Sequence, residues 1–351
     1  MKVLFDLKHP AQVQFFKDAI AILRDEGHEV LVTSRAKDET TDLLDALGIL
    51  HVRLSSPAKG FLGMGLELAR RTARLIRIAR RFRPDVMVAR TGVSIGPAGK
   101  LLHIPTIVFD DTEFAWLQIS LSATFATVIC TGLGYERRFP GKELRFNAPP
   151  YLAGTHPKRF TPSAEVLRRH GVEAGEPYIV LRFKSWSALH DAGVRGPRDE
   201  EICRLVDAVR AYGRPIVSTE RPLPAELRGY VNPVPVDGVY HLLAFAQLYV
   251  GEGACMATEA ACLGTPGIWL SPSSRRGSLD AIERKYGHVT TVQTVPQAIE
   301  RARAWLEPPG MKGRAMAARD RLVAECDDPV EFTLEVIKRY GRKLRGPGSG
   351  G

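Results

Sequence analysis

The sequence predicts an α/β fold of two doubly wound, Rossmann-like domains that face one another across a cleft. Short runs of β-branched and aliphatic residues alternate with segments of helical periodicity, which is the pattern of parallel βαβ units. The alternation pauses in a stretch rich in proline and glycine at residues 147–157 and then resumes. A chain of 351 residues, 44% of them hydrophobic, is long enough for two cores. We expect an N-terminal domain over residues 1–150, a C-terminal domain over 151–345 and a flexible tail over 346–351.

The N-terminal domain is expected to begin with a strand at residues 3–7. A helix follows, with apolar positions three or four residues apart, and it stops at Gly27, a residue type that commonly ends helices. Further strands are expected at residues 29–33, 50–54, 86–89, 106–109 and 127–130, and further helices at residues 42–47, 66–83 and 95–102.

The C-terminal domain repeats this rhythm. Its strands are expected at residues 178–182, 215–218, 234–236, 248–250, 267–270 and 289–292, and helices follow Val295, Met311 and Val330. Domains of this kind bind ligands at the carboxyl ends of their strands, so functional side chains are expected in the loops at those ends.

Residues 250–270, VGEGACMATEAACLGTPGIWL, have the pattern of a strand, a glycine-rich turn, a helix and a second strand. Gly251 and Gly253 allow the backbone to turn tightly, and the N–H groups of residues 254–257 favour a phosphate at the start of the helix. Glu259 follows one turn later, where a carboxylate can accept hydrogen bonds from a ribose diol. The combination indicates a nucleotide diphosphate. The alternative is that the glycines only shape a packed turn and that Glu259 is a solvated helix residue.

Two loops of the N-terminal domain carry candidate catalytic residues. After the first strand, His9 is a candidate general base, because an imidazole titrates near neutral pH; the alternative is an ordinary loop hydrogen bond. After residues 106–109 come three carboxylates suited to acid and base catalysis, Asp110, Asp111 and Glu113. A helix cap requires only one of them, so capping does not account for all three.

A third polar loop follows the first strand of the C-terminal domain. Arg182 and Lys184 are suited to a phosphate group, Ser185 can add a hydrogen bond, and Trp186 can stack on a base. The alternative is a partly buried tryptophan flanked by solvated cations. We favour binding, because this loop is expected to point into the same cleft as the glycine-rich turn.

The net charge of +10 indicates an anionic partner. Arginines recur at helical spacing in the helix expected at residues 66–83, opposite a face of apolar residues; they are Arg70, Arg74, Arg77 and Arg81. The favoured interpretation is a solvated face that covers a sheet. The sharper alternative is contact with an anionic membrane surface or a lipid-linked acceptor. Nucleic acid is disfavoured, because no binding motif accompanies the charge.

Several other classes of protein are disfavoured. No apolar run approaches the roughly 20 residues that span a bilayer, and the N-terminus does not resemble a signal peptide, so we expect a cytoplasmic protein, with peripheral contact to the inner membrane face as an alternative. The five cysteines form no CxxC pair, which argues against disulfides and zinc. Met256 stands where a GxGxxG motif has its third glycine, and no P-loop motif is present. We expect no metal and no cofactor beyond a nucleotide-sugar substrate.

Four blocks of sequence resemble a known family. They are KHPAQVQFFKDAIAILRDEGHEVLVTSR, FDDTEFA, RFKSWSALHDAGVRG and GEGACMATEAACLGTP. Together they resemble an archaeal and bacterial family known as a domain of unknown function, which is similar to the two-domain glycosyltransferase-B (GT-B) superfamily. Within that superfamily the chain is similar to the UDP-N-acetylglucosamine 2-epimerases and to the transferase that adds N-acetylglucosamine to lipid-linked muramyl peptide.

The resemblance implies a nucleotide-sugar donor held mainly by the C-terminal domain. It places the diphosphate at Gly253, Ala254, Cys255 and Met256, and the ribose at Glu259. It also adds two phosphate contacts, Arg182 and Ser185.

In the N-terminal domain the resemblance places His9 in an acceptor loop and FDDTEFA near the catalytic His-Glu-Ala-Gly segment of the epimerases. Asp111, Thr112 and Glu113 replace that segment here, which argues against this particular epimerase mechanism. The sequence thus predicts a GT-B-like, metal-independent glycosyltransferase in which His9 or one of the three carboxylates deprotonates the acceptor. The alternatives are a nucleotide-sugar epimerase and a non-catalytic nucleotide-sugar binding protein.

Overall fold

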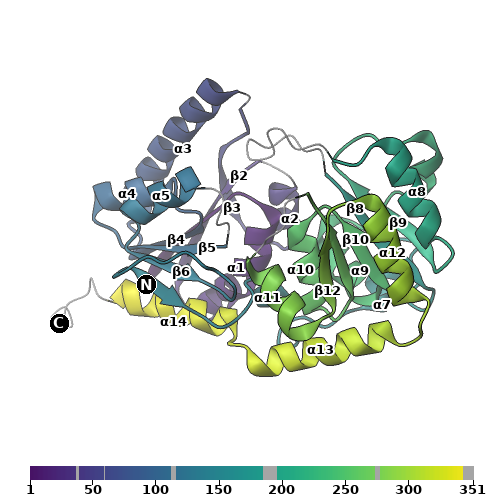
Figure 1. The fold of residues 1–351 in the computed structure, drawn as a ribbon. Helices are drawn as coiled ribbons and strands as arrows, with labels where there is room; N and C mark the ends of the chain where they lie inside the picture. Colours follow the sequence, from purple (N-terminus) through teal and green to yellow (C-terminus); the bar gives the residue numbers. More distant parts are fainter. Residues whose placement is uncertain (37–38, 59, 112–115, 185–195, 273–276, 343–351) are drawn as a thin grey trace. The chain divides into compact units, whose positions relative to one another are not determined.

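The computed structural model describes residues 1–36, 39–58, 60–111, 116–184, 196–272 and 277–342. The chain divides into two compact units, which we call unit 1 (1–154 and 327–351) and unit 2 (155–326). Each unit has a parallel sheet with helices on both faces, so the predicted α/β class with two doubly wound sheets is confirmed (Figure 1). None of the helices in the described ranges is long and apolar enough to cross a membrane.

Unit 1 contains a sheet of seven parallel strands in the order β3-β2-β1-β4-β5-β6-β7. The strands are β1 (Lys2–Leu7), β2 (Glu29–Arg35), β3 (His51–Ser55), β4 (Val86–Arg90), β5 (Thr106–Asp110), β6 (Val128–Thr131) and β7 (Glu143–Arg145). The helices are α1 (Pro10–Asp25), α2 (Thr40–Ala46), α3 (Phe61–Phe82), α4 (Ile95–Leu102), α5 (Trp116–Phe125), α6 (Leu152–Thr155), whose last residue belongs to unit 2, and α14 (Pro329–Arg342). The polar strand β7 at the sheet edge was not expected from the sequence.

The central strands of unit 1 are buried on both faces, which is why their sequences read as continuous apolar runs. Successive side chains of β1 alternate between the two layers. Leu4 belongs to the core formed with α3, α4 and α5. Phe5 packs against Phe16 of α1 in the core on the opposite face, with 5.3 Å between the ring centroids.

Helix α14 corrects the expected domain boundary. We expected residues 151–345 to form the C-terminal domain, but the chain returns to unit 1 at Asp327. Phe332 of α14 packs 4.9 Å from the ring of Phe146 and 6.4 Å from that of Phe109. The burial of this apolar helix face on the sheet of unit 1 is the physical reason, and sequence order alone does not reveal it.

Unit 2 contains a sheet of five parallel strands in the order β12-β11-β10-β8-β9. The strands are β8 (Tyr178–Phe183), β9 (Arg214–Thr219), β10 (Leu248–Gly251), β11 (Gly267–Leu270) and β12 (Val289–Val292). The helices are α7 (Ala164–Arg168), α8 (Asp199–Val209), α9 (Val239–Phe245), α10 (Ala254–Cys262), α11 (Gly277–Tyr286), α12 (Val295–Leu306) and α13 (Met311–Glu325). Helices α8 and α12 share a core with one face of the sheet.

The prediction of a strand at residues 234–236 is wrong. Val234 is instead followed by a short 3₁₀ helix, Val236–Gly238, which leads into α9. Pro233 and Pro235 flank Val234, and neither has an N–H group to donate to a neighbouring strand. The other expected strands are present, with ends that differ by at most two residues.

Candidate functional site

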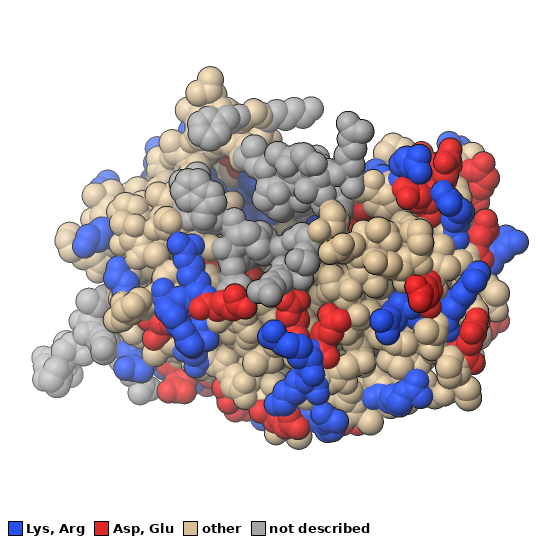
Figure 2. Space-filling view, in the orientation of Figure 1, with Lys and Arg blue, Asp and Glu red and all other residues tan. Residues whose placement is uncertain are grey.

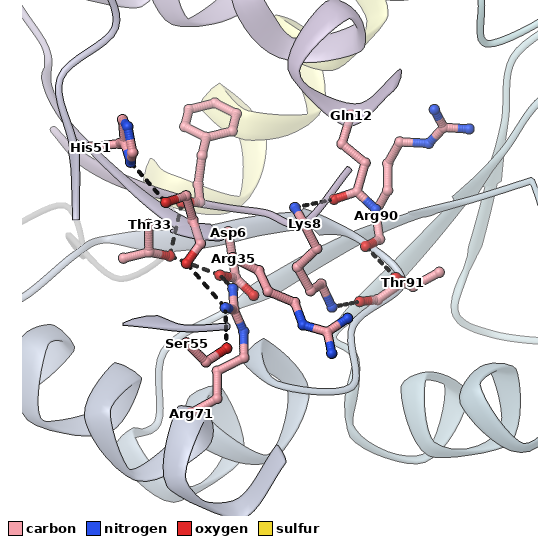
Figure 3. Close-up of polar contacts among 12 residues, drawn as sticks. Asp6, Lys8, Gln12, Thr33, Arg35, His51, Ser55, Arg71, Arg90 and Thr91 are labelled. Carbon is pink, nitrogen blue, oxygen red and sulfur yellow. Dashed lines mark hydrogen bonds and ion pairs between the residues drawn. The ribbon is translucent and has the colours of Figure 1, made fainter. Parts of the chain in front are cut away.

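Polar side chains gather at the carboxyl ends of neighbouring strands in each unit. In unit 1, Asp6 at the end of β1 lies beside Thr33 of β2 in register, and β1 also pairs with β4. Figure 3 shows the side chains that meet there. The neighbourhood follows directly from the parallel strand order, because all the strands end at the same edge of the sheet.

Asp6 and Arg71 form a buried ion pair at this edge. The carboxylate of Asp6 accepts a hydrogen bond from the guanidinium of Arg71, which reaches it from α3, and a second from the hydroxyl of Thr33 at 2.8 Å. Arg71 also donates to the backbone oxygen of Ser34 at 3.1 Å (Figure 3). The side chains of Asp6 and Arg71 are 0% and 2% exposed, so neither charge is solvated by water.

Lys8 lies next to this pair, on the loop between β1 and α1. Its Nζ donates to the backbone oxygen of Thr91 at 2.9 Å, and its backbone N–H donates to Oε1 of Gln12 at 2.8 Å (Figure 3). Burial lowers the pKa of Lys8 to about 8, even though the nearby charge of Asp6 acts in the opposite direction. The amine of Lys8 therefore loses its proton more readily than an ordinary lysine does.

Arg35 and Glu67 form a second ion pair beside the first. Two nitrogens of Arg35 donate to the two carboxylate oxygens of Glu67, at 2.7 and 2.6 Å. The hydroxyl of Ser55 donates to the same carboxylate at 2.8 Å. Burial acts to raise the pKa of Glu67, but the hydrogen bonds from Arg35 and Ser55 outweigh it and the pKa is lowered. This end of the sheet is thus lined by alternating charges held in fixed positions.

A third pair joins Arg90, the last residue of β4, to Asp111, which follows β5. Oδ2 of Asp111 accepts hydrogen bonds from the guanidinium of Arg90 and from the hydroxyl of Tyr151, the latter at 3.0 Å. The guanidinium also lies 5.3 Å from the ring centroid of Phe15 and 5.5 Å from that of Tyr151. Asp111, a predicted catalytic residue, is 15% exposed and is anchored by these contacts.

His9 is exposed and forms the N-cap of α1. Its Nδ1 accepts a hydrogen bond from the backbone N–H of Ala11 at 3.1 Å. A neutral imidazole with an accepting Nδ1 carries its proton on Nε2, so in this arrangement His9 presents a donor. The carbonyl of the same Ala11 lies 3.4 Å from a guanidinium nitrogen of Arg90, which connects His9 to the Arg90–Asp111 pair.

Of the other two predicted catalytic carboxylates, Asp110 lies among the described residues and Glu113 does not. Asp110 ends β5 in register with Thr131 and is 3% exposed. Glu113 lies outside the described residues, so its contacts and the cap of the following helix stay untested.

In unit 2, the glycine-rich turn closes β10 and begins α10 as predicted. Gly251 pairs with Arg182 of β8, and a Cβ at position 251 would lie 2.6 Å from the backbone oxygen of Arg182. A glycine is therefore needed at 251 for the strands to approach, which supports the structural interpretation of that residue. Gly253 is the N-cap of α10, and a Cβ there would lie 3.1 Å from the hydroxyl of Tyr249.

The first turn of α10 is half-buried and carries no side-chain cap among the described residues. Its residues are Ala254, Cys255 and Met256. The N–H of Ala257, which we expected to be available to a phosphate, instead donates to the oxygen of Gly253 at 3.0 Å. The predicted anion site thus begins with the three preceding residues, because α-helical hydrogen bonding engages N–H groups only after the first turn.

Arg182 stands beside this turn, with its Cγ within 3.5 Å of a Cβ built on Gly253. Its guanidinium donates to the hydroxyl of Ser218 at 2.7 Å and to the carboxylate of Glu220 at 2.6 Å. The Arg182 side chain is 23% exposed, which leaves it accessible at the edge of the sheet. The two contacts hold the guanidinium toward β9, while the stem of the side chain passes beside the start of α10, where the resemblance places a phosphate.

Glu252 is a buried acid at the same turn that the sequence interpretation missed. It is 1% exposed, and its Oε2 accepts the backbone N–H of Lys184 at 2.8 Å. Its carbonyl accepts the indole N–H of Trp269 at 3.2 Å. Glu252 thus ties the loop after β8 to the turn after β10. The signal was available in the sequence, because Glu252 stands between the two glycines.

Glu259 is 6% exposed, so it is not the solvated helix residue of the alternative interpretation. Its Oε1 accepts a hydrogen bond from the hydroxyl of Tyr240 in α9 at 3.0 Å. Burial, reinforced by the charge of Glu259, raises the pKa of Tyr240 well above its usual value, so the phenol remains a donor. The role of Glu259 toward a ribose stays a prediction.

The remaining predicted binding residues, Ser185 and Trp186, lie outside the described residues. Among the residues that are described, no three His, Cys, Asp or Glu side chains are grouped so as to hold a metal ion.

Comparison with known families and proteins confirms the resemblance drawn from the sequence. A family model described as "Protein of unknown function (DUF354)" matches residues 1–133. Uncharacterized protein MJ0665 of Methanocaldococcus jannaschii is 22% identical and covers 97% of this chain and 98% of its own length. A relative from Moorella thermoacetica is 28% identical over 54% of each chain; it is UDP-N-acetylglucosamine--N-acetylmuramyl-(pentapeptide) pyrophosphoryl-undecaprenol N-acetylglucosamine transferase.

Solved structures support the same fold. A putative UDP-N-acetylglucosamine 2-epimerase from Listeria monocytogenes matches with a TM-score of 0.71 at 12% identity, over 100% of this chain and 98% of its own. The spinosyn rhamnosyltransferase SpnG, solved with thymidine diphosphate, matches with a TM-score of 0.63 at 14% identity, over 96% of this chain and 100% of its own. At these identities the likeness shows the fold that the glycosyltransferases and the epimerases share.

Proposed function

We propose that this protein is a metal-independent glycosyltransferase that uses a nucleotide-diphosphate sugar. The observation that carries the proposal is in unit 2, where the half-buried first turn of α10 has no side-chain cap among the described residues and the stem of Arg182 passes beside it. Helix N–H groups and a fixed cation are what a departing diphosphate needs when no metal ion neutralises its charge. The names of the relatives support this donor class, since they include a UDP-N-acetylglucosamine transferase and an enzyme solved with thymidine diphosphate.

In the proposed reaction, an acceptor hydroxyl attacks the anomeric carbon of the sugar. The new C–O bond forms as the bond from that carbon to the diphosphate oxygen breaks, and the diphosphate leaves with the bonding electron pair. The hydroxyl proton passes to a base in unit 1. The predicted candidates for this base are His9, Asp110, Asp111 and Glu113.

The contacts in unit 1 favour Asp111 among the candidates that are described. His9 presents a proton donor, and Asp110 is almost entirely buried. Asp111 is partly accessible, and Arg90 and Tyr151 hold its carboxylate in place. Lys8 adds an amine whose pKa is lowered by burial to about 8, a second group in unit 1 that could take part in proton transfer.

A nucleotide-sugar epimerase is the second candidate, because an epimerase shares the fold over the whole chain. An epimerase converts the donor without an acceptor, whereas a transferase releases nucleotide diphosphate only when an acceptor is present. A third outcome is a non-catalytic binding protein, which would bind the donor and convert nothing.

Binding is tested first, by calorimetry with UDP-N-acetylglucosamine and with a thymidine-diphosphate sugar. Arg182→Gln should weaken binding by about 1.5 to 3 kcal/mol, the usual effect of losing a hydrogen bond to a charged group. The matched control is Arg168→Gln, an exposed arginine in the same unit. If neither nucleotide sugar binds, the proposed donor class is wrong. If Arg182→Gln binds as the wild type does, the donor site is elsewhere.

Conversion is followed by ¹H and ³¹P NMR of the bound donor, with and without acceptors. Appearance of an epimer without an acceptor would establish the epimerase. Release of nucleotide diphosphate that depends on an acceptor hydroxyl would establish the transferase.

A further inference from the structure

One face of helix α3 remains uncovered in unit 1, and it carries exposed apolar side chains at one end and exposed arginines along the rest. In Figure 1 the helix extends away from the sheet. Residues on its outer face recur along the sequence at intervals of three or four positions. This outer stripe, which we call the α3 stripe, consists of Leu62, Leu66, Arg70, Ala73, Arg77 and Arg81, all of which are exposed.

The first two turns of the α3 stripe are apolar. Leu62 is 88% exposed and Leu66 is 51% exposed, and Met64 beside them is 38% exposed. Isolated exposed leucines are common, but here three large apolar side chains are concentrated at one end of one helix. Figure 2 shows uncharged side chains at this end of α3 on the face in view.

The later turns of the α3 stripe are basic. Arg70, Arg77 and Arg81 have no ion-pair or hydrogen-bond partner among the residues that the structure describes, and neither does Arg80 next to them. The single acidic residue of α3 is Glu67, and it is engaged on the inner side by Arg35. The outer face therefore carries unneutralised positive charge along about three turns.

From these two features we propose that the α3 stripe docks on an anionic lipid membrane surface. The apolar end enters the boundary between headgroups and acyl chains, and the arginines lie against the headgroups of acidic lipids. Stable peripheral binding generally needs both an apolar and an electrostatic contribution, and α3 supplies both on one face. The chemistry matches an anionic interface better than a second copy of this chain, because two copies of the stripe would bring unpaired arginines together.

The inner face of the same helix links this surface to the polar edge of unit 1. Arg71, the neighbour of Arg70, reaches Asp6, and Glu67, the neighbour of Leu66, reaches Arg35. A membrane held on the outer side of α3 would thus be separated from Asp6 and Arg35 by the width of this helix. A lipid-linked acceptor is the substrate class that this arrangement would serve, and this part of the inference rests on the proposed function.

The test is co-sedimentation of the full chain with vesicles, without any nucleotide sugar. Vesicles of phosphatidylcholine mixed with phosphatidylglycerol should bind the protein, vesicles of phosphatidylcholine alone should bind it much less, and high salt should reduce the binding. The double variant Leu62→Ser with Leu66→Ser should lower the partition coefficient by about tenfold or more. The double variant Arg77→Gln with Arg81→Gln should lower it by a similar factor and flatten its salt dependence.

Matched controls separate α3 from the general charge of the protein. Leu101→Ser removes another exposed leucine, from α4, and the pair Arg301→Gln with Arg303→Gln removes two exposed arginines from α12. These controls should bind vesicles as the wild type does. Equal losses in controls and α3 variants, or no preference for acidic lipid, would overturn the proposal.

Two further measurements distinguish membrane docking from dimerisation and from an effect on donor binding. If a second copy of the chain covers the α3 stripe, sedimentation velocity would show a dimer for the wild type and a monomer for the Leu62→Ser, Leu66→Ser variant. That result would also overturn the proposal. Donor affinity should be the same in the α3 variants and the wild type, so vesicle binding and nucleotide binding succeed or fail separately.

Discussion

Arg71 on α3 meets Asp6 at the end of β1, and the two side chains are almost entirely withdrawn from solvent. Its neighbour Arg70 points outward and is exposed. Two adjacent arginines of one helix thus have opposite environments: Arg71 is buried at the candidate site, and Arg70 faces outward. This contrast gives a matched pair of variants.

Arg71→Met should destabilise the protein by about 3 to 5 kcal/mol, because it leaves the carboxylate of Asp6 buried without its cation. Arg70→Met removes the same group from the surface and should change the free energy of unfolding by less than about 0.5 kcal/mol. Urea unfolding of both variants measures the difference. If the two variants are equally stable, the buried pair does not contribute as the geometry indicates.

The pH dependence of stability should report on Lys8. The pKa of Lys8 is lowered to about 8 in the folded protein from its ordinary value of 10.5, so between these values the unfolded chain binds more protons. Stability should therefore rise as the pH increases from about 8 to about 10.5, and the cost of burying the charged amine should be fully present below pH 8.

Lys8→Met should remove this dependence and raise stability at pH 7 by up to about 3 kcal/mol. Lys100→Met, at an exposed lysine of α4, is the control and should leave the pH profile unchanged. Chemical denaturation at a series of pH values tests the prediction, and parallel profiles for wild type and Lys8→Met would contradict it.

Glu259→Ala should weaken nucleotide-sugar binding by about 1 to 3 kcal/mol if the carboxylate accepts hydrogen bonds from a ribose. The contact with Tyr240 adds a cost in stability that the sequence did not suggest, because the phenol loses its acceptor. Tyr240→Phe serves as the control, since it removes the same hydrogen bond but keeps the carboxylate. Loss of stability in both variants with unchanged donor affinity in both would make Glu259 a structural residue only.

Substitutions at the unit 1 loops should separate catalysis from donor binding. His9→Ala, Asp111→Asn and Glu113→Gln are each expected to leave donor Kd nearly unchanged, and the variant that removes the base should lower kcat by roughly 10²- to 10⁴-fold. Donor Kd and turnover are measured on the same preparations. Normal turnover in all three variants would place the chemistry elsewhere, and loss of donor binding would contradict the division of labour between the units.

Turnover and donor binding should persist in EDTA, because the site as proposed stabilises the leaving diphosphate with helix N–H groups and Arg182. Activity is measured before and after chelation and after addition of Mg²⁺ or Mn²⁺. Loss of turnover on chelation that a divalent ion restores would show that the proposal omits a metal.

The sequence by itself determined the two parallel sheets, nearly all of their strands and the glycine-rich turn before α10. These features depend on periodicity and on local turn chemistry, which are properties of neighbouring residues. For the same reason Arg70, Arg77 and Arg81 of α3 were identified correctly as exposed, whereas Arg74, also exposed, donates to the backbone oxygen of Leu54 at 2.6 Å.

Only the tertiary structure decided which charges meet. Asp6 and Arg71 are 65 positions apart, and Arg90 and Asp111 are 21 positions apart, so no local pattern joins them. The structure likewise returned α14 to unit 1 and gave Glu259 its partner in another helix. Strand order and the burial of apolar faces fix these contacts, and both are set by the packing of distant segments against one another rather than by any short stretch of sequence.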